Sequence, residues 1–203
     1  MIEVKVLSHT DRPDWTISHA GRVCYRSDRE DNVSHFIKAR IKDGHESIIE
    51  HASITFEIGG ISRACSHQLV RHRLASYSQE SQRYVDGEDF EYVIPPGVAA
   101  SEKATQVFED LMGQVRDAYK LLRRMGVRKE DARFVLPNAA TTRIIVTMNF
   151  RELRHFFSVR CNIAAQWEIR KVATEMLIHS YWVSPAAFSD LMEKFGLMPR
   201  VTP

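Results

Sequence analysis

The run Arg71-His72-Arg73 contains the side chains of this sequence that are best suited to binding chemistry. Seven residues separate the run from Ser81, and Arg83 follows closely. Guanidinium groups grip phosphates and carboxylates through paired hydrogen bonds, and the hydroxyl and amide side chains in between add further hydrogen-bonding groups. These residue types favour a cradle for an anionic molecule rich in polar groups, such as a nucleotide. On composition alone, a solvated basic turn is the competing interpretation.

A helix just before this run is expected to contribute to the same cradle. Ser62 is a suitable N-cap for a helix over residues 63–73. Gln68 and Arg71 are three positions apart on that helix, so both side chains can reach one ligand. Residues 75–84 have no helical stripe, and we expect them to form an ordered loop.

A further arginine, Arg160, is expected on the apolar face of a helix over residues 152–166, together with Phe156. Burying a guanidinium without a partner is very costly, so Arg160 must meet an anion or an acceptor. An ion pair between subunits and a ligand in a dry pocket both meet this need. Arg151 and His155 lie one turn apart on roughly the opposite face. One helix therefore serves two pockets, and we expect sites that are shared between subunits.

Potential metal ligands gather in one part of the sequence, at His45, His51, Cys65, His67 and His72. Their spacing does not match a zinc finger, a closely spaced cysteine pair is absent, and the HEXXH pattern does not occur. We therefore expect no metal site.

The three cysteines, Cys24, Cys65 and Cys161, are odd in number and widely spaced. This argues against a disulfide framework and suits a reducing compartment. Apolar or helical neighbours favour small core residues over reactive thiols at all three positions.

Hydrophobic periodicity predicts the elements that hold these side chains. Strands are expected at 2–9, at 52–58 up to Gly59-Gly60, and at 141–150. Helices are expected at 14–27 with Asp14 as N-cap, at 34–43 up to Gly44, at 101–125 up to Gly126 and at 129–135, and two or three more follow before Glu193. Residues 45–51 read as a polar connector held down by two isoleucines. The sequence predicts a single α+β domain over residues 1–203, with a few-stranded, twisted, mainly antiparallel sheet flanked by several helices.

Composition narrows the class of protein. The chain has 203 residues and a net charge of only +2, too small to indicate a nucleic-acid surface. No apolar stretch is long enough to span a bilayer, and the first residues do not read as a signal peptide. We expect a cytoplasmic protein that binds neither membrane nor nucleic acid. Arginine greatly outnumbers lysine among the 28 basic residues, which suits anion binding and also salt bridges between subunits.

Three segments resemble the flavin-dependent thymidylate synthases. RHRLASYSQESQRY, from Arg71 to Tyr84, is similar to the signature of that family, which is Arg-His-Arg, seven residues and Ser. GHESIIEH resembles the upstream flavin-contacting segment of the family, and the segment from Ala132 to Arg160 resembles the downstream one. The order and rough spacing of the three agree. Ser78 stands where many members have Asn, and some relatives have Asn at the position of His155.

The resemblance implies two sets of binding residues. A set expected to hold dUMP comprises Gln68, Leu69, Val70, Arg71, Gln79, Glu80, Ser81, Gln82, Arg83, Arg133 and Arg160. A set expected to hold FAD comprises Ser47, Glu50, Arg71, His72, Arg73, Gln79, Asn149, Phe150, Arg151 and His155. The catalytic role falls on Arg160, whose charge would stabilise the uracil ring after loss of its N3 proton.

The resemblance also implies the reaction and the assembly. The enzyme is expected to methylate dUMP to dTMP in nucleotide biosynthesis. Methylenetetrahydrofolate would be the carbon donor, FAD and NADPH the reductants, and tetrahydrofolate the released product. The unrelated class of thymidylate synthase attacks uracil with an activated thiolate, and no cysteine here lies in a matching motif. A homotetramer is implied. A nucleic-acid-binding module and an inactive descendant of the enzyme are the alternatives.

Overall fold

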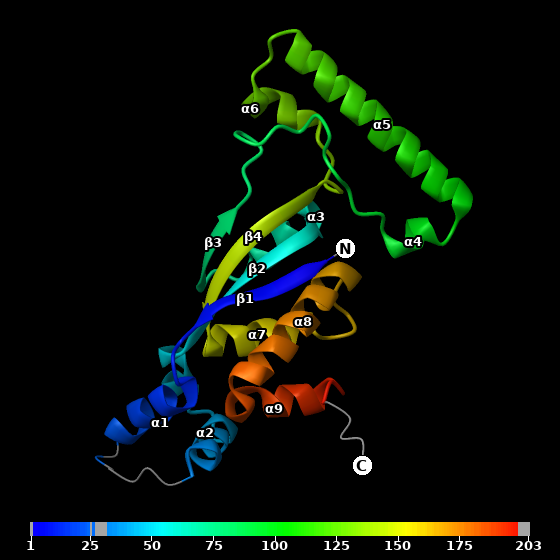
Figure 1. Cartoon of the computed structure of the whole chain (residues 1–203). Helices are drawn as coiled ribbons and strands as arrows, with labels where there is room; N and C mark the ends of the chain where they lie inside the picture. Colours follow the sequence, from blue (N-terminus) through cyan, green and yellow to red (C-terminus); the bar gives the residue numbers. More distant parts are fainter. Residues whose placement is uncertain (1, 25, 27–31, 199–203) are drawn as a thin grey trace. The chain divides into compact units, whose positions relative to one another are not determined.

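A four-stranded sheet organises the chain (Figure 1). In this computed structural model, residues 2–24, 26 and 32–198 are described. The strands are β1 (Glu3–His9), β2 (Ser53–Ser62), β3 (Ala75–Gln79) and β4 (Thr141–Asn149), and they form an open antiparallel sheet in the order β1-β2-β4-β3. Alternate residues of β2 and β4 are buried, which gives the period of two of a half-buried strand. The predicted α+β class is confirmed.

The chain divides into two compact units, and every division except the one after Leu69 falls within a strand. Unit 1 comprises Met1–Glu3, Gly59–Leu69 and Ser78–Ile144, and unit 2 comprises Val4–Ile58, Val70–Tyr77 and Ile145–Pro203. The expectation of one domain over residues 1–203 stays a prediction.

The helices of unit 2 come from its first and last segments. They are α1 (Pro13–Val23), α2 (Val33–Lys42), the 3-10 turn η1 (Glu46–His51), α7 (Phe150–Arg160), α8 (Trp167–Val183) and α9 (Pro185–Lys194). α7 packs against α8, α9 and η1, and α1 packs against α2 and η1. Phe150, Phe157 and Phe188 are fully buried in ring contact where α7 meets α9. Burying each such ring stabilises the fold by roughly 1.5–3 kcal/mol. This core fixes α7, which carries Arg151, and also η1 beside it.

Unit 1 is built around the long helix α5 (Glu102–Arg124), with α6 (Lys129–Ala132) and η2 (Arg133–Val135) near one end and α4 (Pro96–Ala99) near the other (Figure 1). Ser101 caps α5 by accepting a hydrogen bond from the Ala104 amide at 3.3 Å. Gly126 has a φ of 86° after its last turn, a conformation that favours glycine. The predicted helix over 101–125 is confirmed.

Two predictions around the arginine-rich run are wrong. The helix after Ser62 is α3 (Arg63–Leu69), which ends before Arg71, so Gln68 and Arg71 are not one turn apart on it. Ser62 does act as the expected cap, since its hydroxyl accepts from the Cys65 amide at 3.0 Å. The segment expected to be a loop contains β3, because it pairs with β4. Pairing with a distant strand overrides the polar composition of this segment.

The predicted boundaries of other elements need smaller corrections. The N-cap of α1 is Arg12, and Asp14 lies inside the first turn. The Asp14 carboxylate accepts a hydrogen bond from the Ser184 hydroxyl instead. α1 ends at Val23, and residues 25 and 27 of the expected helix lie outside the described residues. β2 continues through the glycine pair to Ser62. The helix expected over 152–166 ends at Arg160.

Candidate functional site

Unit 2 contains a cavity of about 720 Å³, and all but one of the residues that line it have polar or charged side chains. η1 and α7 supply most of the side chains that line the cavity. The exposed Leu74, which directly precedes β3, also lines it. The lining residues are Glu46, Glu50, Leu74, Asn149, Arg151, Glu152, Arg154, His155 and Ser158. A cavity of this size with a few charged groups around it is typical of a site for a small molecule or cofactor.

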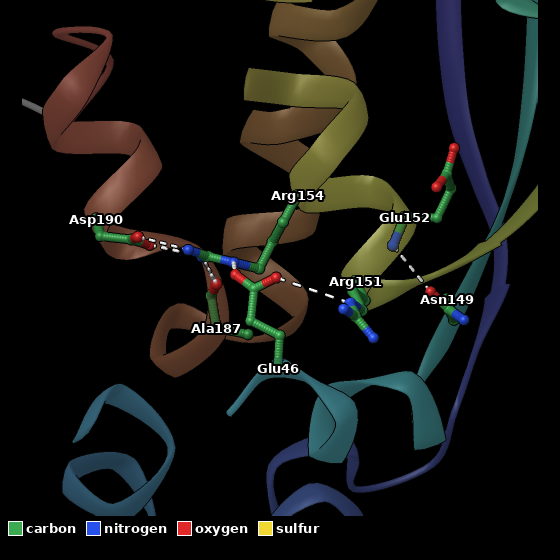
Figure 2. A network of polar contacts seen from close by, with 7 residues as sticks. All are labelled: Glu46, Asn149, Arg151, Glu152, Arg154, Ala187 and Asp190. Atoms are coloured by element: carbon green, nitrogen blue, oxygen red, sulfur yellow. Dashed lines mark hydrogen bonds and ion pairs between the residues drawn. The ribbon is translucent and has the colours of Figure 1, made fainter. Parts of the chain in front are cut away.

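Arg151 is the cation of this cavity that ligands can reach. Its guanidinium donates to the Glu50 carboxylate at 2.5 Å. It also lies 3.9 Å from the Glu46 carboxylate (Figure 2). The hydrogen bond to Glu50 and then the charge of Glu50 raise the pKa of Arg151. Since half of the Arg151 side chain is exposed, these ion pairs are weak and an anion can compete for the guanidinium.

Asn149 has a fixed orientation at the start of α7. Its side-chain oxygen accepts from the Glu152 amide at 2.9 Å (Figure 2). This N-cap bond occupies the acceptor end of the amide. The NH2 end therefore remains for a ligand, so Asn149 acts as a donor in this cavity.

Arg154 is a buried cation that the sequence reasoning missed. Its guanidinium donates to both carboxylate oxygens of Asp190, at 2.7 and 2.6 Å, and to the Ala187 carbonyl on α9. Its Nε lies 3.6 Å from Glu46 (Figure 2). Arg154 thus ties α7 to α9 and to η1. Its partner Asp190 is 36 positions away, so no local sequence pattern identifies the pair. The only signal in the sequence is that Arg154 lies among the apolar residues of this helix, where an arginine needs a partner.

Arg160 is not among the residues that line the cavity, but it contacts His72, whose ring lies beside the lining residues Glu152 and His155. The Nε of Arg160 donates to Nε2 of His72 at 3.1 Å. His72 is buried, and its Nδ1 lies 3.5 Å from a carboxylate oxygen of the equally buried Glu152. Burial, the charge of Arg160 and then that of His155 lower the pKa of His72 to about 4. The imidazole is therefore neutral near pH 7, and it provides Arg160 with a fixed acceptor.

Unit 1 holds a second polar cluster, at the end of β3. The Gln79 amide donates to the hydroxyls of Ser66 and Thr142, at 2.9 and 3.2 Å. Arg63 donates to the Thr142 hydroxyl and to the Glu80 carbonyl. These bonds fix the side chain of Gln79 and the backbone that leads into Ser81.

Two of the four arginines expected at dUMP, Arg83 and Arg133, contact Glu130 of α6. Arg83 donates to the Glu130 carboxylate at 3.3 Å, and the Nε of Arg133 donates to the Glu130 carbonyl at 3.1 Å. Ser81 accepts from the Arg83 amide at 3.3 Å. Glu130 therefore contacts two of the arginines predicted to hold dUMP, both in unit 1.

The two predicted ligand sets differ in where the structure places them. Within the dUMP set, Gln68, Leu69, Gln79, Glu80, Ser81, Gln82, Arg83 and Arg133 lie in unit 1, whereas Val70, Arg71 and Arg160 lie in unit 2. Within the FAD set, only Gln79 lies in unit 1, whereas Ser47, Glu50, Arg71, His72, Arg73, Asn149, Phe150, Arg151 and His155 lie in unit 2. Four of the latter, Glu50, Asn149, Arg151 and His155, line the cavity together. The side chains of Leu69 and Phe150 are fully buried, so ligand contacts there would come from backbone atoms.

The cysteines differ from one another in exposure. Cys65 and Cys161 are buried, as expected of small core residues, but Cys24 is exposed, so the prediction is wrong for Cys24. Burial raises the pKa of Cys161 to about 12. A thiol with such a pKa is protonated near pH 7 and is a poor nucleophile.

The described residues also bear on metal binding and on membrane spans. Among the residues that the structure describes, no group of three or more His, Cys, Asp or Glu side chains is arranged to hold a metal ion. In the same part of the chain, every helix is too short or too polar to cross a membrane.

Comparison with known proteins matches most of the chain to one family. The family described as thymidylate synthase complementing protein (Thy1) matches residues 5–186. A flavin-dependent thymidylate synthase of Geobacter sulfurreducens is 52% identical over 200 residues, covering 93% of this chain and 86% of the relative. That of Nitratidesulfovibrio vulgaris is 44% identical, covering 97% and 91%, and that of Pyrococcus furiosus is 44% identical, covering 87% and 78%. With matches of this extent, and with the fold and the polar cavity described above, the chain belongs to the Thy1 family of flavin-dependent thymidylate synthases.

Proposed function

We propose that this enzyme methylates dUMP to dTMP, with methylenetetrahydrofolate as carbon donor and FAD with NADPH as reductant, and that it releases tetrahydrofolate. Membership of the family supports the reaction. The observation that carries the proposal is the cavity of unit 2, where Glu50 meets Asn149, Arg151 and His155, which lie about 100 positions further along the chain, and all four are expected to contact a flavin. Methylenetetrahydrofolate and NADPH follow from the resemblance to the family.

The lining of the cavity fits a flavin dinucleotide. Arg151 would bind the diphosphate, since its ion pairs with Glu50 and Glu46 are exposed and can be exchanged for phosphate. Asn149 would donate from its NH2 group, and His155 would hydrogen-bond the flavin or its ribityl chain. When bound, the reduced flavin would supply the hydride that completes the methyl group.

The residues of the dUMP set would hold the nucleotide. Arg83 and Arg133 would bind the phosphate of dUMP, and Ser81 and Gln79 would hydrogen-bond its sugar and base. Their present partners support this role, because Glu130 holds Arg83 at the surface in an ion pair that a phosphate can replace. Gln79 is already held by two hydroxyls.

Arg160 would carry out the electrostatic part of catalysis. Loss of the N3 proton leaves negative charge on the uracil ring, and a guanidinium at the ring would stabilise that charge and make carbon 5 more nucleophilic. Carbon 5 would then form a bond to the methylene carbon of the folate as the bond from that carbon to the folate nitrogen breaks, and the proton on carbon 5 leaves. No thiol takes part, in accord with the buried and protonated state of Cys161.

The assembly proposed is a cytoplasmic homotetramer with sites shared between subunits. Arg151 and Arg160 lie on one short helix, yet Arg151 lines the cavity and Arg160 is bonded to His72. Two functions on separate sides of α7 support two pockets. Light scattering of the purified protein tests the tetramer, and a monomeric mass at micromolar concentration would contradict it.

Flavin binding provides the direct test of the cavity. The purified protein should be yellow, with absorption bands near about 370 and 450 nm, which are general values for flavins. Arg151→Ala should weaken FAD binding by about tenfold or more, as expected for loss of a charged hydrogen bond worth roughly 1.5–3 kcal/mol. Arg124→Ala, at an exposed position of α5 in unit 1, is the control. Equal FAD affinity in the two variants would contradict the proposed site.

A further inference from the structure

His72 lies at the centre of three contacts within unit 2. Its Nε2 accepts from Arg160 at 3.1 Å, its Nδ1 lies 3.5 Å from Glu152, and its backbone carbonyl accepts from the Tyr77 hydroxyl at 2.8 Å. The ring also packs edge-on against Phe156, with 4.9 Å between ring centres and 90° between planes. The backbone, the ring plane and Nε2 are therefore held by direct contacts, and Nδ1 faces a buried carboxylate.

The contact with Arg160 determines where the imidazole proton lies. An arginine Nε in a protein always carries a hydrogen and can only donate. Nε2 of His72 must therefore offer a lone pair. In a neutral imidazole the single proton is then on Nδ1, and that nitrogen faces the carboxylate of Glu152.

Glu152 is suited to keep the imidazole proton on Nδ1 of His72. Its side chain is only 7% exposed, and its own amide is capped by Asn149, so the start of α7 fixes its position. A carboxylate beside one ring nitrogen is the usual means by which proteins set the tautomer and orientation of a histidine. Burial is also the main cause that raises the pKa of Glu152, partly opposed by the charge of His155, so the carboxylate has little solvent to compete with its histidine contact.

We infer that Glu152 is a positioning residue for Arg160: it holds His72 in the Nδ1-protonated form, whose Nε2 lone pair orients the Arg160 guanidinium. This inference rests on the proposed function, in which Arg160 stabilises the uracil anion. It assigns to Glu152 a role that the resemblance did not give it. The chain Glu152–His72–Arg160 links the wall of the cavity to the catalytic cation through one ring.

Two substitutions at one position separate this role from simple packing. Glu152→Gln keeps an oxygen that can accept from Nδ1, whereas Glu152→Leu fills similar space without an acceptor. Turnover should fall about 10- to 100-fold in the leucine variant, the size of effect expected from misplacing a catalytic group. The glutamine variant should recover most of that loss. Circular dichroism checks that both variants fold.

The second readout does not depend on activity. Nitrogen-15 spectra of protein with labelled histidine report which ring nitrogen is protonated, and loss of signals in His72→Gln assigns His72. In unliganded wild type and in the glutamine variant, His72 should be neutral with the proton on Nδ1. In the leucine variant, His72 should exchange between tautomers, and the Nε hydrogen of Arg160 should exchange with solvent at least about tenfold faster, as for a hydrogen bond weakened by about 1.4 kcal/mol.

The possible outcomes are distinct. A proton on Nε2 in the wild type overturns the inference even if the leucine variant fails to fold. Wild-type turnover in the leucine variant overturns it as well, and so does a glutamine variant as slow as the leucine one. If the wild type has no thymidylate synthase activity, the proposed function fails, while the spectra still decide whether Glu152 and His72 hold Arg160.

Discussion

The ion pair between the buried Arg154 and the half-exposed Asp190 predicts an unequal response to loss of either partner. The side chain of Arg154 is 9% exposed, whereas that of Asp190 is 54% exposed. Asp190→Ala leaves a guanidinium inside unit 2 with only the Ala187 carbonyl and the more distant Glu46 as acceptors. Arg154→Met leaves a carboxylate that water can reach, and the methionine fills much of the vacated space.

The magnitudes follow from these exposures. Breaking a buried pair and leaving its charge unpaired costs about 3–5 kcal/mol, and the remaining acceptors of Arg154 reduce this to about 2–4 kcal/mol for Asp190→Ala. Arg154→Met should cost about 1–2 kcal/mol, as for lost hydrogen bonds to a charged group that can rehydrate. The double variant should be more stable than Asp190→Ala alone, because it removes the unpaired buried charge.

Urea unfolding at one fixed protein concentration measures the stability of all three variants, since the stability of the proposed tetramer would depend on concentration. The pKa of Asp190 gives a second check. Although burial raises it, hydrogen bonds and charge from Arg154 lower it overall. The stability from this pair is thus present above the unfolded pKa of the carboxyl and is lost as the pH falls through the folded pKa. A larger cost for Arg154→Met than for Asp190→Ala would refute this reasoning.

Three further predictions concern single side chains. The folded pKa of His72, about 4, is below its ordinary value of 6.5, so the unfolded state binds the proton first as the pH falls. The free energy of unfolding should therefore decrease by up to about 3 kcal/mol as the pH falls from 6.5 to 4. Thermal melts of His72→Gln should lack this part of the pH dependence, and an unchanged slope would contradict the prediction. At pH 8, an alkylating reagent should modify the exposed Cys24 long before Cys161 in mass spectra, and Cys24→Ser should keep full turnover; early labelling of Cys161 would show that its thiol is not buried. Arg160→Ala should lower kcat by a factor corresponding to about 3 kcal/mol with FAD still bound, and an unchanged rate would remove its assigned role.

Local patterns predicted much of the fold. Alternation in β2 and β4 and the apolar stripe of α5 each arise from burial of one face, so they are visible in the sequence. Caps such as Ser62 and Ser101 are also local, because the hydroxyl bonds an amide three residues away.

Features that depend on distant partners were not predictable in the same way. β3 exists because residues 75–79 pair with β4, which lies far along the chain. The role of Arg154 depends on Asp190 and Ala187, and that of Glu152 on His72. The resemblance pointed to the ligand sets, but only the structure brings Glu50, Asn149, Arg151 and His155 around one cavity.

We propose that this enzyme forms dTMP through charge placement and a flavin, without an enzyme thiol. Tritium release from dUMP labelled at carbon 5 tests this mechanism, with NADPH, methylenetetrahydrofolate and FAD each omitted in turn. We predict that the complete mixture releases tritium and forms dTMP, and that omission of any one component abolishes dTMP formation. We also predict undiminished tritium release by a variant in which Cys24, Cys65 and Cys161 are all replaced by Ala. dTMP formation in the absence of flavin, or its loss in a folded cysteine-free variant, would contradict the account.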